Sequence, residues 1–176
     1  ESLPFLEALR QLRNELGGNK TLFIHITFVP FISSANEFKT KPTQHSVKEL
    51  LGLGIQPDIL ICRTEKNFNQ ESKKKISLFC NLSMDSVIML ENAKTIYEVP
   101  IKLFNEGLLK KLNNHFNFKF KIKTNLELWE QFVLKFLALE NEINVAIVGK
   151  YTNLPESYKS INEALFHSGI YKNTKV

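Results

Sequence analysis

The chain has 176 residues, of which 43% are hydrophobic and 23% are charged, with a formal net charge of +5 and an isoelectric point near 9.1. This composition is typical of a globular protein with a real core, and no apolar run approaches the ~20 residues of a membrane-spanning helix. The excess of basic residues is compatible with an anionic ligand, but it does not distinguish a nucleotide from a nucleic acid or a membrane surface.

The cysteines and histidines indicate neither a disulfide framework nor a metal site. Cys62 and Cys80 are the only cysteines, and both lie in apolar surroundings, so we expect reduced thiols in the core of a cytoplasmic protein. The histidines are isolated from the cysteines and from one another, at His25, His45, His115 and His167. This spacing predicts no metal site, and His25 is expected to be a hydrogen-bonded core residue.

The first two thirds of the chain alternate helix and strand patterns. An amphipathic helix is predicted from Ser2 to Leu16, where two glycines follow, and the apolar run 22–29 predicts a strand buried on both faces. Further elements are predicted in the order helix 44–53, strand 58–62, helix 70–79, strand 86–90, a helix near 93–97 or after Pro100, and a helix at 108–112. This alternation predicts an α/β fold with a doubly wound, mostly parallel sheet.

The loop 30–44 carries two lysines one residue apart, Lys39 and Lys41. Pro42 disfavours the helical conformation for Lys41, so we expect an extended segment that presents both ammonium groups on one face. The loop also leaves the carboxyl end of a predicted parallel strand, where ligands gather in open α/β sheets. The segment is therefore a candidate anion site, and the competing interpretation is a solvated basic loop before a surface helix.

The helix that follows begins close to these lysines. Thr43 is one candidate N-cap, and Ser46 with Glu49 forms an alternative capping box. Either start leaves unpaired backbone N–H groups and the positive end of the helix dipole beside the lysines, which favours an anion such as a polyphosphate.

The segment 115–123 alternates aromatic or aliphatic residues with polar ones and lysines at a period of two. We expect an amphipathic edge strand there. A stacking platform for single-stranded nucleic acid is not favoured, because the rings and the lysines would point to opposite faces.

The last third of the chain begins a second set of elements. Thr124 and Glu127 form a capping box before a helix that runs to Leu137, and polar residues at 140–142 then interrupt the pattern. A strand at 143–148 and a helix at 156–166 follow, so we place a domain boundary near 140–142.

Several of these segments together resemble the CTP synthase family. The most specific is Lys39-Thr40-Lys41-Pro42-Thr43-Gln44, which continues in the same register to Leu51. Further matches occur in family order at 1–8, 54–63, 77–81, 148–151 and 158–160. The resemblance implies an internal fragment of the family protein: the C-terminal part of a Rossmann-like, P-loop-type synthetase domain at 1–123, a linker helix at 124–142, and the first strand and helix of a class I glutamine amidotransferase domain at 143–176.

The family reaction, as the resemblance implies it, is the ATP-dependent amination of UTP to CTP in de novo pyrimidine nucleotide biosynthesis. ATP and Mg²⁺ phosphorylate the oxygen on carbon 4 of uracil, and ammonia from glutamine then displaces the phosphate. CTP is the feedback inhibitor, GTP is the allosteric activator, and the enzyme is a cytoplasmic homotetramer without a membrane or nucleic-acid partner.

The resemblance also implies which residues bind nucleotide. The UTP and CTP site would contain Lys39, Thr40, Lys41, Pro42, Thr43, Gln44 and Lys75. Phe79, which shares a helix face with Lys75, would lie near the pyrimidine, and Glu1 matches the end of a nucleotide-contacting Asp-Ile-Glu element. The backbone of Asn92 and Ala93 would meet adenine.

No catalytic residue and no metal ligand is expected within the chain. It begins with Glu rather than Met and ends after a helix-like segment, so we infer a fragment that makes no CTP by itself. In the family the ATP loop and the magnesium ligands lie upstream of such a segment, and the glutaminase nucleophile lies downstream. The alternative is a non-catalytic module that binds phosphate-rich ligands, including RNA, through its basic segments.

Overall fold

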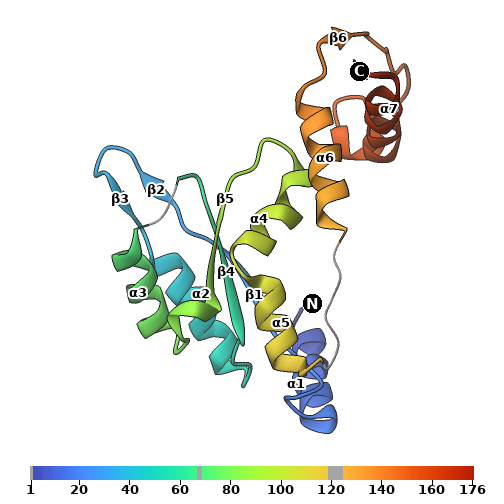
Figure 1. Ribbon diagram of the computed structural model, residues 1–176. Helices are drawn as coiled ribbons and strands as arrows, with labels where there is room; N and C mark the ends of the chain where they lie inside the picture. The colour runs from blue at the N-terminus through green and yellow to red at the C-terminus, as the bar shows by residue number, and fades with distance from the viewer. Residues whose placement is uncertain (1, 67–68, 119–124) are drawn as a thin grey trace. The chain divides into compact units, whose positions relative to one another are not determined.

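The computed structural model describes residues 2–66, 69–118 and 125–176, and the chain divides into two compact units, Glu1–Ile122 and Lys123–Val176 (Figure 1). The elements of the first unit are α1 (Leu3–Leu16), β1 (Ile24–Phe28), β2 (Phe31–Ile32), β3 (Glu37–Phe38), α2 (Lys41–Gly52), β4 (Ile59–Thr64), α3 (Gln70–Phe79), η1 (Met84–Ser86), β5 (Val87–Glu91), η2 (Ile96–Glu98), α4 (Val99–Asn105) and α5 (Leu108–Phe116). The prediction of a parallel α/β fold is confirmed by this arrangement.

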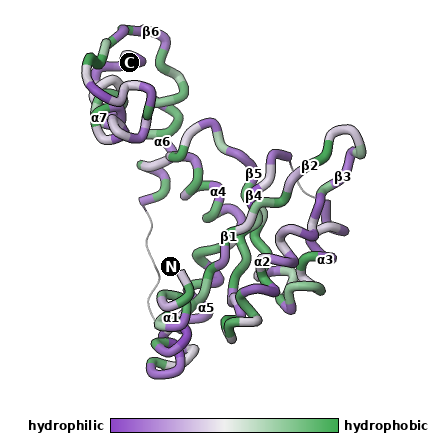
Figure 2. The backbone as a smooth tube through the Cα atoms, turned by 180° about the vertical axis from the view of Figure 1, so that it is seen from behind, coloured by the Kyte–Doolittle hydropathy of each residue, from purple (hydrophilic) through white to green (hydrophobic). Residues whose placement is uncertain are grey.

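A parallel three-stranded sheet forms the centre of the first unit. Its strand order is β1-β4-β5, with Ile24 opposite Ile59 and Leu60 opposite Val87. Helices α2 and α3 cover one face, and α4 and α5 cover the other (Figure 1). Each of these helices carries hydrophobic and hydrophilic residues in alternation along its length, as expected for helices with one buried side (Figure 2).

Two hydrophobic clusters fill the space between the sheet and its helices. The cluster under α2 and α3 consists of Val29, Val47, Leu60, Cys62, Ile76, Cys80 and Val87. The cluster on the opposite face consists of Ile59, Ile61 and Ile88, packed against Leu22, Leu90, Leu103 and Leu108. Strand β4 contributes to both clusters because it lies in the middle of the sheet and is covered on both faces.

The prediction that the first strand is buried on both faces is wrong. Thr27 is buried, but Ile24, Ile26 and Phe28 are 40%, 59% and 45% exposed. These three side chains lie on the face that α4 and α5 cover, but the core residues there come from β4 and β5. Strand β1 is an edge strand of the described sheet, so the side chains that it places on that face remain exposed.

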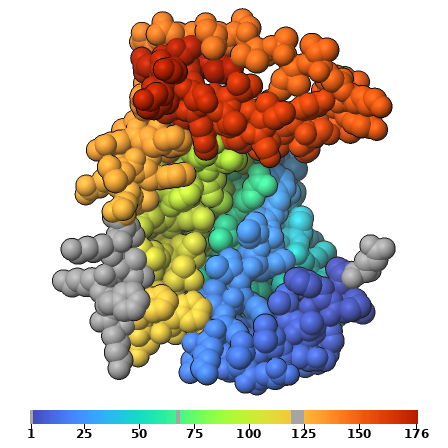
Figure 3. All heavy atoms as spheres, turned by 90° about the vertical axis from the view of Figure 1, so that its right-hand side faces the viewer, coloured from blue at the N-terminus to red at the C-terminus, as the bar shows by residue number. Residues whose placement is uncertain are grey.

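Charged and polar contacts join α1 to the amino ends of the strands. Arg13 donates to both carboxylate oxygens of Asp58, at 2.5 and 2.9 Å, and the N–H of Phe23 donates to the same carboxylate at 2.7 Å. His115 of α5 donates to the carbonyl of Thr21 at 2.8 Å. The segment after α1 therefore lies beside α5, as the space-filling view from this side shows (Figure 3).

The second unit is built from two packed helices. It contains α6 (Leu126–Leu137), β6 (Asn141–Glu142), η3 (Pro155–Tyr158), α7 (Lys159–Lys172) and β7 (Thr174–Lys175). The ring of Phe132 meets His167 edge-on at 6.0 Å, and Phe136 meets Phe166 edge-on at 6.4 Å. Strands β6 and β7 pair in parallel over two residues.

One strand predicted in the last third of the chain is not formed, and another is wrong at its start. Residues 143–148 adopt no regular structure, and Ile143, Val145 and Val148 are 52%, 50% and 95% exposed. A parallel strand is stable only beside strands that pair along its length, and β7 provides a neighbour of two residues. The edge strand predicted at 115–123 is wrong at its start, because α5 continues to Phe116, and residues 119–124, including the predicted cap Thr124, lie outside the described residues.

Among the described residues, no helix combines the length and the apolar character that a membrane crossing needs.

The Asp58 contacts make a testable contribution to stability. Burial of the carboxyl group opposes its ionisation, but hydrogen bonds from Arg13 and Phe23 prevail and lower the pKa of Asp58 below its ordinary value of 3.8. The stabilisation is therefore present above that value and is lost as the pH falls through the lower folded-state pKa. We expect Asp58→Asn to reduce the free energy of unfolding by about 2 kcal/mol at pH 7.

Urea denaturation at pH 7 and at pH 3 tests this expectation. The difference in stability between wild type and Asp58→Asn should narrow at the lower pH. Glu7→Gln, which breaks the partly exposed Glu7–Arg10 ion pair of α1, is the control and should cost less than Asp58→Asn at pH 7. An equal difference at both pH values would contradict the role given to the carboxylate.

The two thiols should be unreactive in the folded protein. Burial raises the pKa of Cys62 to about 12 and that of Cys80 to about 11, so almost no thiolate is present at pH 8. A disulfide reagent that releases a coloured thiolate should therefore react slowly under native conditions and quickly with two equivalents in urea. Fast native reaction of either thiol would show that the core around α3 opens readily.

Candidate functional site

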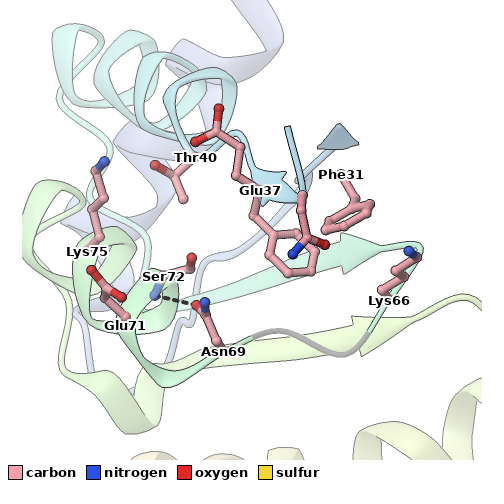
Figure 4. A pocket seen from close by; sticks show the side chains of 10 residues that line it. Phe31, Glu37, Thr40, Lys66, Asn69, Glu71, Ser72 and Lys75 are labelled. Carbon is pink, nitrogen blue, oxygen red and sulfur yellow. Dashed lines mark hydrogen bonds between the residues drawn. The ribbon is translucent and has the colours of Figure 1, made fainter. Parts of the chain in front are cut away.

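A pocket lies at the carboxyl edge of the parallel sheet. Its volume is about 490 Å³, and its walls come from the β2–β3 hairpin, the start of α2, the loop after β4 and the first turns of α3 (Figure 4). The lining residues are Phe31, Asn36, Glu37, Phe38, Thr40, Lys66, Asn69, Glu71, Ser72 and Lys75. The sequence-based expectation that a ligand site lies beyond the strand ends agrees with this position.

The β2–β3 hairpin forms one wall and was not predicted from the sequence. Phe31 pairs with Phe38 across it, and their rings meet edge-on with centroids 5.0 Å apart. Asn36 adopts a left-handed conformation in the turn, with φ of 49°. Asn36 at the end of the short Ser-Ser-Ala-Asn segment was the available signal, because Asn tolerates that conformation better than most residues.

Helix α2 begins earlier than expected, at Lys41, and Thr40 is its N-cap with φ −83° and ψ −16°. The prediction that residues 39–41 are extended is therefore wrong at Thr40 and Lys41. Pro42 occupies the second helical position, where its missing N–H would have no partner within the helix, so the proline starts the helix here. Its effect on the conformation of Lys41 is outweighed by the contacts that place α2 on the sheet.

Those contacts involve the two residues that were expected to cap the helix. Thr43 is fully buried, and its hydroxyl donates to the Thr27 hydroxyl of β1 at 3.0 Å. Ser46 is hydrogen-bonded to the Nε2 of His25 at 2.8 Å. The prediction of a hydrogen-bonded histidine is confirmed, although His25 is half-buried, and its burial lowers the pKa of the imidazole. Neither Thr43 nor Ser46 caps α2.

The structure brings together part of the predicted anion site. Thr40 and Lys75, which are distant in the sequence, both line the pocket. Gln44 donates to the Thr40 hydroxyl at 3.0 Å, so it supports the lining from one turn further along α2. Lys39 and Lys41 are exposed on the chain segment beside the pocket.

An ion pair that the sequence did not reveal joins a residue of the pocket to a lysine beside it. Glu37, on β3, accepts a hydrogen bond from the ammonium of Lys39. This hydrogen bond and the charge of Lys39 lower the pKa of Glu37, and the charge of Lys75 contributes in the same direction. The carboxylate therefore lies within the electrostatic influence of two of the predicted lysines.

The start of α3 forms the opposite wall. Asn69 caps the helix by accepting a hydrogen bond from the Ser72 N–H at 2.9 Å, the dashed line in Figure 4. The ammonium of Lys66 lies 4.1 Å from the centroid of the Phe31 ring, a cation–π contact. Asn69 could have been found from the sequence, because an N-cap residue stands directly before the predicted helix 70–79.

Other predicted residues lie apart from the pocket. Phe79 is 60% exposed at the end of α3 and does not line it. Asn92 and Ala93 follow β5 at the same edge of the sheet, where the ammonium of Lys102 donates to the Asn92 carbonyl at 3.1 Å. Glu1 lies outside the described residues. Within the described ranges, no group of three or more His, Cys, Asp or Glu side chains could hold a metal ion.

The arrangement is suited to holding an anion rather than to transforming one. Lysine ammonium groups and the amino end of α2 supply positive charge at one edge of the sheet. Both described cysteines are buried core residues, so neither is available as a nucleophile. The pocket thus has the features of a binding site for a multiply charged ligand.

Comparison with known proteins gives the family. A family model described as the CTP synthase N-terminus matches residues 1–118. All 176 residues align with proteins named CTP synthase, at 51% identity in Rhodospirillum rubrum, 52% in Syntrophus aciditrophicus and 48% in Pelagibacter ubique. The chain covers 32%, 32% and 33% of these relatives, so it spans about one third of their length. Because the family model matches more than half of the chain, the chain belongs to the CTP synthase family.

Proposed function

We propose that this chain carries the triphosphate-binding part of the UTP and CTP site of a CTP synthase. The observation that supports it most directly is the position of Lys39, Lys41 and Lys75 in and beside one pocket at the carboxyl edge of the sheet. In the whole protein, this site would hold UTP while ATP activates the uracil oxygen and ammonia from glutamine replaces it.

The chemistry of that reaction explains why a binding site matters. Phosphoryl transfer depends mainly on the positioning of the reactants and on neutralisation of their charge. Lysines provide mobile point charges that suit a flexible triphosphate chain. CTP has the same triphosphate as UTP, so it would compete for the same contacts, and this accounts for feedback inhibition by the product.

The adenine contact at Asn92 and Ala93 is part of the same proposal. Both residues follow β5 and therefore lie at the carboxyl edge of the sheet, as the pocket does. The magnesium ligands would lie outside this chain, since the described residues contain no group of three or more His, Cys, Asp or Glu side chains that could hold a metal ion.

We also propose that residues 1–123 belong to the synthetase domain, 124–142 to a linker, and 143–176 to the start of a glutamine amidotransferase domain. The end of the family match at residue 118 and the division into compact units at Ile122 and Lys123 support the first boundary. The segments 148–151 and 158–160, which resemble the family, support the last assignment. Homotetrameric assembly and activation by GTP belong to the same proposal for the whole protein.

Calorimetric titration with UTP and with CTP tests the nucleotide site. The double variant Lys39→Ala/Lys41→Ala should bind both nucleotides at least about tenfold more weakly, because it loses two charges near the triphosphate. Lys75→Ala should weaken binding about three- to tenfold.

Lys48→Ala is the matched control for these titrations. Lys48 is also exposed on α2 but lies about two turns beyond Lys41, so this variant should bind like wild type. Unchanged affinity in the double variant, or equal losses in the control, would contradict the proposed triphosphate site.

The alternative is a module that binds phosphate-rich ligands such as RNA, which the net charge of +5 and the exposed lysines favour. Competition separates the two functions. We expect UTP to displace labelled CTP, whereas homopolymeric RNA at the same phosphate concentration should not. Displacement by RNA, or RNA binding that survives loss of Lys39 and Lys41, would favour the alternative.

A further inference from the structure

The ion pair between Glu37 and Lys39 is the least expected feature of the pocket. Glu37 lines the pocket, and its carboxylate is bonded to a lysine ammonium that we assign to the triphosphate. The two side chains are 51% and 49% exposed, so a ligand has access to both. A carboxylate at this place repels phosphate, so Glu37 does not attract the ligand and must have another role.

The fold fixes this pair through the β2–β3 hairpin. Phe38, between the two charged residues, packs against Phe31 on the other strand. The N–H of Lys39 donates to the carbonyl of Pro30 at 2.9 Å, which holds the segment against the exit from β1. Residues two apart in an extended segment project to the same side, so Glu37 and Lys39 meet without help from another element.

The carboxylate is also placed among the other charges of the pocket. In Figure 4, Glu37 lies between Lys75 at one end and the Phe31 and Lys66 contact at the other. The charge of Lys75 acts on Glu37 in addition to that of Lys39. A triphosphate that reaches Lys39 and Lys75 together would therefore have to approach this carboxylate.

We propose that Glu37 is a built-in competitor of the phosphate ligand. In the free protein, the Glu37 carboxylate is bonded to the Lys39 ammonium. When a triphosphate binds, it displaces this carboxylate from Lys39. Glu37 thereby lowers the affinity for nucleotide and favours its release from the site. This inference rests on the proposed function, and the opposite role, in which Glu37 positions Lys39 for the ligand, predicts a change of opposite sign.

The test measures affinity for UTP and for inorganic triphosphate by calorimetry in Glu37→Gln. At 50 mM salt we expect binding about three- to tenfold tighter than in wild type, because the repulsion and the competing ion pair are both lost. At 500 mM salt the gain should shrink to less than about twofold, because exposed charges are screened. Inorganic triphosphate should show the same gain as UTP, since the effect concerns the phosphates.

Two further variants isolate the mechanism. Glu49→Gln removes the same charge from an exposed position near the end of α2, away from the pocket, and should change affinity by less than about twofold. In a Lys39→Ala background, Glu37→Gln should give a smaller gain than in wild type, because the ammonium for which it competes is gone.

The results separate failure of this inference from failure of the proposed site. If wild type binds UTP and Glu37→Gln binds it equally or more weakly, the competitor role is overturned and the proposed function stands. If neither protein binds UTP or triphosphate, the proposed function fails and the competitor role fails with it. Tighter binding in Glu37→Gln at low salt, without a matching gain in Glu49→Gln, supports the inference.

Discussion

The parallel pairing of β4 with both of its neighbours determines where the candidate site lies. β4 pairs with β1 on one side and with β5 on the other, and residues Ile59 to Cys62 are buried throughout. Parallel strands all run in one direction, so the chain crosses back over the sheet between successive strands. The segments that leave the strands therefore meet at one edge, and this brings Thr40 and Lys75 to one pocket despite their distance in the sequence.

The pocket combines attraction and repulsion in a small space. Lys66 and Lys75 line it together with Glu37 and Glu71, and the hydroxyl of Thr40 is already bonded to Gln44. Its polar groups are thus partly satisfied without a ligand. A site of this kind exchanges internal contacts for ligand contacts, which makes the net free energy of binding smaller than the sum of its charges suggests.

Much of the fold follows from local patterns, but the placement of side chains does not. The pattern at 70–79 predicted α3 with its observed bounds, and in the structure Asn69 caps this helix. The predicted start of α2 was wrong, because Thr43 is buried against β1 instead of capping the helix. Such a tertiary contact cannot be inferred from the residue preferences of helix caps. Residues 143–148 have a strand pattern but lack paired neighbours. In the pocket, Lys75 was identified from the sequence, whereas Lys66, Glu37 and Phe31 were found only in the structure.

The contacts of Asp58 lie at the other end of the strand that leads to the pocket. Asp58 precedes β4 and Thr64 ends it, so about 20 Å of strand separates the two. The first end attaches α1 to the sheet through hydrogen-bonded charges, and the second opens toward the lysines. Substitutions more than about 10 Å apart with no shared partners usually have additive effects. Substitutions at the pocket end of β4 can therefore change the affinity of the candidate site for a ligand while the contacts at the other end maintain stability.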